Sequence, residues 1–275
     1  CYSLSTVVVD GTVYVAAHTL RDEADRLYAL DADTGTERWQ RTADVHDSRP
    51  TVVDDRLFVS GDPRIAAFDT ATGERQWSVD AVGPVESAPT VCDGTVFAGS
   101  DDQVFYALDA ASGAFEWTYR SEWAIEATPA AADGTVYLPC NDERLYAFDA
   151  TTGAVEWTAD IDRPRRASPA VADGVVYLTD RSCCRALDAD SGAERWAVEI
   201  DANPSATPAV AGDTVFAGGS DDEGDCLYAL DALNAETGAQ RWTYEAELPR
   251  RASLSLVDGI VFVPTRDDAV HALYA

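Results

Sequence analysis

The chain carries one short sequence unit six times. Each copy begins with Ala-Leu-Asp or Ala-Phe-Asp and ends in a tryptophan that lies four residues after a glycine. The copies occupy residues 29–39, 67–77, 107–117, 147–157, 186–196 and, with three extra residues, 229–242, and they end at Trp39, Trp77, Trp117, Trp157, Trp196 and Trp242. A period of about 40 residues is typical of solenoids and propellers. The chain is therefore predicted to be one structural unit repeated in series.

Between the tryptophans, each period contains four short runs of β-branched and aromatic residues, the pattern of β-strands. An Asp-Gly dipeptide usually follows the first run and supplies the positive φ angles of a two-residue hairpin. An Asp-x-x-Thr/Ser-Gly loop leads from the third run to the tryptophan run. Its aspartate can accept backbone N–H bonds, and its glycine can adopt the left-handed conformation. We therefore predict an all-β propeller of four-stranded antiparallel blades.

The number of runs gives the number of blades. Runs one to three occur seven times, whereas the tryptophan run occurs six times, and its seventh copy would begin where the sequence stops, at Ala275. We expect a single propeller domain over residues 1–275, with seven visible blades and a last blade that lacks its outer strand. Residues 1–4 are too short to supply that strand, so we expect it upstream of Cys1. An eighth blade there also stays open.

The chain is strongly acidic. It has 49 acidic and 20 basic residues, a net charge of -29, and every basic residue is an arginine. In molar salt the Debye length shrinks to about 3 Å, which mutes the repulsion between like charges. We interpret the chain as halophilic, of haloarchaeal type. The alternative is an acidic face for a basic partner, but the acidic residues are spread over every repeat.

The same composition bounds the partners and the compartment. A charge of this sign disfavours nucleic acid. No run of eighteen apolar residues predicts a membrane span in this chain, and we expect a monomer.

The sequence contains no methionine, so Cys1 is either internal to a longer chain or produced by processing, as in lipid-modified exported proteins. A strand pattern already begins by about Ser5, which leaves little tether. The location is left open, with an exported or cell-surface protein favoured over a cytoplasmic one.

The motif A-x-D-x-x-T/S-G-x-x-x-W, preceded by S/T-P-x-V-x-D-G-x-V-Y, resembles the repeat of the PQQ-like quinoprotein propellers, which include BamB-like proteins and quinoprotein alcohol dehydrogenases. The resemblance covers essentially the whole chain. It implies that the tryptophan docks between adjacent blades, so the six repeat tryptophans are expected to be structural.

The resemblance implies three functions. The leading interpretation is a non-catalytic propeller that binds another protein or a small anionic ligand in the BamB-like manner. The alternatives are a PQQ-dependent dehydrogenase-like oxidoreductase, or a remnant of one, and a sensor domain of a longer chain. PQQ and Ca²⁺ are cofactors implied by the resemblance alone. No catalytic residue and no metal site is assigned, because the three histidines show no ligand spacing.

One cysteine pair bears on the enzymatic alternative. A vicinal disulfide beside the cofactor is found in the dehydrogenase branch, and Cys183 and Cys184 are adjacent. Alignment of the repeats places them at the start of a third strand instead of in a loop over the cofactor. Two ordinary small residues are therefore the favoured interpretation.

The connections between blades surround the mouth of a propeller's channel, where ligands usually bind. Two arginine pairs stand out there, in the parallel sequences RRASP and RRASL. Such guanidinium groups could clamp a carboxylate, a phosphate or a quinone-type anion, or could instead pair with acids of the adjacent blade. The candidate ligand-binding residues are Arg165, Arg166, Arg250, Arg251, Asp47, Glu86 and Glu126. The acidic insertion 220–225 could bind Ca²⁺, although a solvated loop is favoured.

Overall fold

The computed structural model describes residues 2–19, 25–43, 49–162, 168–180, 183–200, 203–204, 207–220, 227–247, 255–257, 260–264 and 269–274. Their regular secondary structure consists of strands alone. The chain divides into two compact units, Cys1–Val136 with Phe148–Ala154 and Tyr137–Ala147 with Val155–Ala275. The division passes through strands β14 (Thr135–Cys140) and β15 (Arg144–Asp149), and a single domain over the whole chain stays a prediction.

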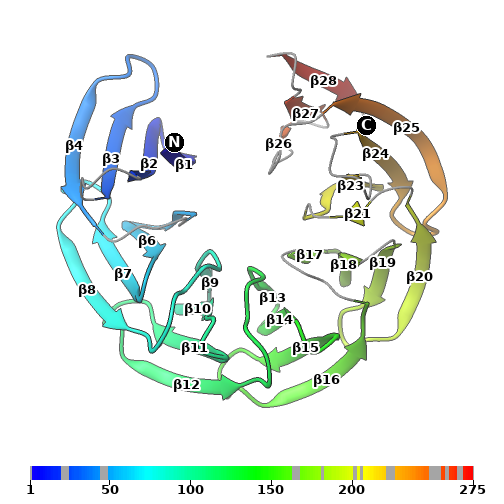
Figure 1. Cartoon of the computed structure of the whole chain (residues 1–275), viewed down its shortest axis with the longest axis horizontal. Coiled ribbons are helices and arrows are strands. Elements are labelled where there is room, and N and C mark those ends of the chain that lie inside the picture. The colour runs from blue at the N-terminus through cyan, green and yellow to red at the C-terminus, as the bar shows by residue number, and fades with distance from the viewer. Residues whose placement is uncertain are drawn as a thin grey trace. The chain divides into compact units, whose positions relative to one another are not determined.

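The first unit contains three complete antiparallel sheets, in each of which four strands pair in chain order. In Figure 1 the tryptophan-bearing strands β4 (Glu37–Thr42), β8 (Arg75–Asp80) and β12 (Phe115–Arg120) follow one another along one edge of this unit. The three sheets are β1 (Tyr2–Val9), β2 (Thr12–Thr19), β3 (Arg26–Asp31), β4 (Glu37–Thr42); β5 (Thr51–Val53), β6 (Arg56–Ser60), β7 (Arg64–Asp69), β8 (Arg75–Asp80); and β9 (Thr90–Cys92), β10 (Thr95–Gly99), β11 (Val104–Asp109), β12 (Phe115–Arg120).

The remaining sheets repeat the pattern, with two variations. The fourth and fifth are β13 (Ala130–Ala132), β14 (Thr135–Cys140), β15 (Arg144–Asp149), β16 (Val155–Asp160) and β17 (Ala170–Ala172), β18 (Val175–Asp180), β19 (Cys183–Asp188), β20 (Glu194–Glu199). In the sixth, β21 (Asn203–Pro204) and β22 (Ala209–Ala211) both pair with β23 (Thr214–Ser220), followed by β24 (Leu227–Asn234) and β25 (Gln240–Glu247). The seventh has three strands among the described residues, β26 (Ser255–Val257), β27 (Ile260–Pro264) and β28 (Val270–Tyr274), as the run count predicts.

The core lies between successive sheets. All five residues of β10 are buried, whereas β12 alternates between exposed and half-buried residues. A strand covered on both faces reads as a continuous apolar run, and an outer strand shows a solvent face. Ile65 and Ala67 of β7 accordingly share one buried cluster with Val96 and Ala98 of β10.

The predicted turn chemistry is confirmed. Asp93 and Gly94, between β9 and β10, have φ angles of 49° and 82°. Positive φ at both central residues gives a turn whose twist matches that of the flanking strands. The Asp-x-x-Thr/Ser-Gly loop is equally regular: the Asp109 carboxylate accepts a bond from the Ser112 amide at 2.8 Å and another from the Ser112 hydroxyl.

The sixth copy of this loop differs from the others. Asn234 stands in place of the aspartate and accepts from the amide and the hydroxyl of Thr237 at 2.9 and 2.8 Å. The three extra residues lengthen β24 rather than the loop. Asn234 therefore precedes Gly238 by the same number of residues that separates the aspartate from the glycine in the other copies.

In the copies of the loop that carry an aspartate, these bonds favour the ionised carboxylate. Arg195, followed by the Ser191 hydroxyl, lowers the pKa of Asp188 from its ordinary value of 3.8 to about 2. Hydroxyl donors likewise lower the pKa values of Asp69, Asp109 and Asp149. Because the folded pKa lies below the unfolded one, the contribution of Asp188 to stability is present above pH 3.8 and is lost as the pH falls toward about 2.

The repeat tryptophans link each sheet to the next. Five of them donate from Nε1 to a backbone carbonyl of the following repeat, at 2.8–2.9 Å: Trp39 to Thr70, Trp77 to Ala110, Trp117 to Ala150, Trp157 to Ala189 and Trp196 to Ala235. The indole also covers the glycine of the following loop. A Cβ built on Gly113 would lie 2.7 Å from the ring of Trp77. The loop glycine is therefore needed both for its φ of 72° and for this close approach.

Candidate functional site

Two connectors of the first unit lie on either side of one short loop. The connectors are residues 81–89, between β8 and β9, and residues 121–129, between β12 and β13; the loop is residues 100–103, between β10 and β11. We call these three segments together the connector surface. They come from adjacent sheets but are joined directly by hydrogen bonds.

The loop holds both connectors through its own polar groups. On one side, the Ser100 hydroxyl donates to the carbonyl of Pro84 at 2.8 Å. On the other side, the amides of Ser121 and Ile125 donate to the carbonyls of Gln103 and Ser100 at 2.8 and 3.1 Å. The far ends of the connectors are tied by a bond from the Ala88 amide to Thr128 Oγ1 at 3.0 Å. The surface is thus held by hydrogen bonds at several points along both connectors.

The carboxylate of Asp102 also joins the loop to the first connector. Asp102 accepts from the Val82 amide at 3.1 Å and from the Tyr106 hydroxyl at 2.7 Å. Burial, and then this bond, raise the pKa of Tyr106 to about 12, so the phenol stays a donor at physiological pH. Asp142 and Tyr146 repeat the pair at 2.6 Å. The sequence analysis missed these pairs, although their common Asp-x-x-x-Tyr spacing would have indicated them.

Two of the predicted ligand-binding residues lie on the connector surface. Glu86 and Glu126 occupy the same position in the two connectors, each half-buried between two buried neighbours. The others, Asp47, Arg165, Arg166, Arg250 and Arg251, lie outside the described residues, as do residues 221–225 of the acidic insertion. A shared face and an anion site therefore stay predictions.

The seventh tryptophan of the chain lies outside the repeat pattern. Trp123 belongs to none of the six copies, and it is 59 % exposed. Trp39, Trp77 and Trp196 are only 6–8 % exposed. Val82, in the other connector, is 87 % exposed. A tryptophan outside its repeat was the available signal in the sequence.

The described residues do not assemble the centre that the quinoprotein resemblance implies. Cys183 and Cys184 open β19, as the alignment predicts, and neither is in a disulfide. Successive side chains of a strand point to opposite faces, and Cys184 is buried while Cys183 is half-buried. Among the described residues, no group of three His, Cys, Asp or Glu side chains is placed to hold a metal ion. The described residues therefore assemble neither the vicinal disulfide nor the cluster of calcium-binding carboxylates that the resemblance implies.

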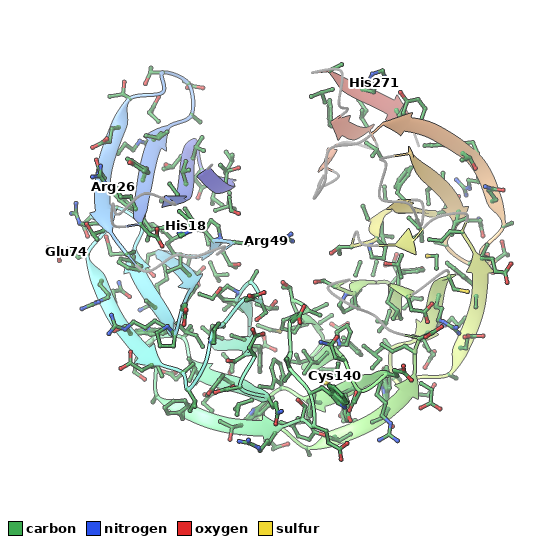
Figure 2. All side chains as sticks on the ribbon, viewed as in Figure 1. His18, Arg26, Arg49, Glu74, Cys140 and His271 are labelled. Atoms are coloured by element: carbon green, nitrogen blue, oxygen red, sulfur yellow. The ribbon has the colours of Figure 1, made fainter. Side chains whose placement is uncertain are left out.

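The two described histidines have local partners. His18 on β2 and His271 on β28 are labelled in Figure 2. Nδ1 of His18 lies 2.8 Å from Asp25, and Nδ1 of His271 lies 2.8 Å from the Tyr244 hydroxyl. His46 is outside the described residues.

In the part of the chain that is described, no helix is long and apolar enough to cross a membrane.

Comparison with solved structures identifies the architecture. BamB from Moraxella catarrhalis is 21% identical, with a TM-score of 0.75 over 100% of this chain and 86% of that one. The computationally designed Ika8 protein is 18% identical, with a TM-score of 0.82 over 99% and 84%. A europium-containing methanol dehydrogenase is 14% identical, with a TM-score of 0.76 over 99% and 79%. The fold is therefore an all-β propeller of antiparallel blades.

Sequence comparison adds the family. No curated protein matches the chain significantly. The family described as outer membrane protein assembly factor BamB matches residues 3–85, 23–179 and 180–275, which together span nearly the whole chain. The chain belongs to this BamB family of PQQ-like repeat propellers.

Proposed function

We propose that the chain is a non-catalytic propeller scaffold that binds another protein through the connector surface. The observation that carries this proposal is the exposure of Trp123 on a segment tied down by hydrogen bonds. Tryptophan is among the residues most enriched at the energetic centres of protein interfaces. A segment that is already ordered loses little conformational entropy on binding.

The charges of the connector surface indicate the chemistry of the partner. Glu122 is exposed beside Trp123, and Glu86 and Glu126 are half-buried in the same connectors. A complementary partner would present an apolar pocket with arginine or lysine at its rim.

The family description names an outer membrane protein assembly factor, which supports a protein partner and an exported or surface location for this chain. We further propose one monomeric domain over residues 1–275.

We expect Trp123→Ala to weaken partner binding by at least about tenfold, the usual effect of removing an interface tryptophan. Phe115 is the matched control, because it is 56 % exposed but lies at the other end of β12. A photo-crosslinking residue at position 123 should capture a protein that one at position 115 does not. That protein, once purified, is titrated against wild type, Trp123→Ala and Phe115→Ala. Equal affinities for wild type and Trp123→Ala would contradict the proposal.

The oxidoreductase alternative is supported only by likeness of fold to the methanol dehydrogenase. Fold alone is a weak guide to chemistry. Adding PQQ with Ca²⁺ and recording the unfolding midpoint and the quinone spectrum separates the two functions, because a scaffold gives neither a shift nor a bound spectrum.

We also propose that the chain is halophilic. The net charge of -29 opposes a compact state unless it is screened. The unfolding midpoint is expected to rise steadily from dilute buffer to molar KCl at neutral pH, and circular dichroism during heating measures it. Full stability in dilute buffer would rule the halophilic interpretation out.

A further inference from the structure

A groove opens between the first two sheets of the first unit. Its volume is about 210 Å³, and it lies between the end of β4 and the face of β7 and β8. Val59, Ala66 and Phe68 give it an apolar floor. Arg64, Arg75 and Ser78 line it as well.

The groove exists because one repeat lacks a side chain that others carry. Aligned on the Ala-x-Asp triplet, Ala66 of β7 corresponds to Tyr28 of β3, Tyr106 of β11 and Tyr146 of β15. Tyr106 and Tyr146 are each 6 % exposed, and their rings fill this position in their own sheets. In the second sheet the methyl group of Ala66 leaves the position open.

A second position, on the outer strand and diagonally across from this one, also differs between the repeats. In the third sheet, Tyr106 packs on Phe115 with ring centroids 6.0 Å apart. In the fifth, Arg185 and Glu194 stand at the same two positions and form an ion pair at 2.5 Å. In the second sheet these two positions hold Ala66 and Arg75, while the strand register pairs Ala66 with Ser78 and Arg75 with Phe68. The exposed side chain of Arg75 therefore has neither a ring contact like that of Phe115 nor an ion pair like that of Glu194 at the diagonal position.

The two arginines differ in what holds them. Arg64 donates from Nε to Asp80 at 2.7 Å. Arg75 has no side-chain partner among the described residues. Arg75 is thus the cation that an incoming anion would meet, in a chain that otherwise repels anions through its net charge of -29.

We propose that this groove binds a small aromatic carboxylate, whose ring takes the place of the missing tyrosine and whose carboxylate pairs with Arg75. The size is suitable, because an apolar cavity of about 150 Å³ accepts benzene, and this groove has about 210 Å³. The ring would pack on Phe68 and Val59. The carboxylate would receive charge-assisted hydrogen bonds from the guanidinium. This site is separate from the connector surface.

Benzoate is the probe that tests the proposal, by calorimetric titration against the whole chain in stabilising salt. We expect saturable binding of benzoate, and at least about tenfold weaker binding of acetate, which lacks the ring, and of benzyl alcohol, which lacks the charge. Either analogue binding as tightly as benzoate would overturn the proposal. So would a failure of benzoate to bind.

Three variants locate the site. Ala66→Tyr introduces the residue that other repeats carry, so it should fold with an undiminished unfolding midpoint and abolish benzoate binding. Arg75→Gln should weaken binding by about tenfold, whereas Arg120→Gln, an exposed arginine outside the groove, should leave it unchanged. Unaltered binding by Ala66→Tyr would place benzoate elsewhere and overturn the assignment. Trp123→Ala should bind benzoate normally, so the two proposals can fail independently.

Discussion

Replacing Trp77 with alanine is expected to lower the free energy of unfolding by about 3–5 kcal/mol, the usual cost of deleting a buried large aromatic side chain. Trp77 is 8 % exposed and packs on Phe58 with ring centroids 6.0 Å apart. Its Nε1 donates to the carbonyl of Ala110 at 2.9 Å. The substitution therefore removes packing within one sheet and a hydrogen bond to the next one.

Denaturant unfolding followed by circular dichroism measures this loss. Trp123→Ala is the matched control, since it removes the same side chain from a position that is 59 % exposed. We expect its stability to lie within about 0.5 kcal/mol of wild type. Equal destabilisation by the two substitutions would show that the repeat tryptophans do not bind neighbouring sheets together.

A second large effect is expected from Gly113→Ala. Its added methyl group would meet a φ of 72° and the ring of Trp77 at 2.7 Å. Gly94→Ala isolates the first contribution, because Gly94 has a φ of 82° but nothing within 4 Å of its Cβ position. The left-handed conformation alone costs about 1–2 kcal/mol. Overlap with a packed ring adds about 1–3 kcal/mol, so Gly113→Ala should be clearly the more destabilising.

The same unfolding measurements compare the two glycine variants. A fluorescence change is expected for Gly113→Ala alone, because only that substitution displaces an indole. If both variants lose the same stability, the close approach of Trp77 contributes nothing, and the glycine is needed for its backbone angle only.

The features that repeat were the ones that could be predicted from the sequence. Trp77 and Gly113 occur in copies at fixed spacing, so each copy confirms the others, and the strand order and turns follow. The Asp-Gly turn at Asp93 needs no tertiary information, because its φ angles follow from residue type. The start of β1 at Tyr2, slightly before the predicted position, shows the usual uncertainty at the end of a strand.

The candidate sites could not be predicted because they depart from the repeat. Trp123 stands out in the sequence because it lies outside the repeat, but the exposure that makes it an interface candidate comes from the structure. Ala66 looks like any core alanine until the register places it where Tyr106 lies in the neighbouring sheet. The carboxylate of Asp102 gains its role from the amide of Val82, which lies 20 residues earlier in the connector before the sheet, and this contact is seen only in the folded chain.

The tryptophan contacts give the chain a direction. Five of the repeat indoles donate to the following repeat, with the hydrogen-bond acceptor 31–39 residues further along the sequence. During synthesis, a newly emerged tryptophan therefore stays exposed until most of the next repeat has left the ribosome. The loop glycine has no such delay, because the indole that packs on it belongs to the preceding repeat. While the chain grows, the indole of the most recently synthesised repeat is uncovered, and the next repeat then buries it.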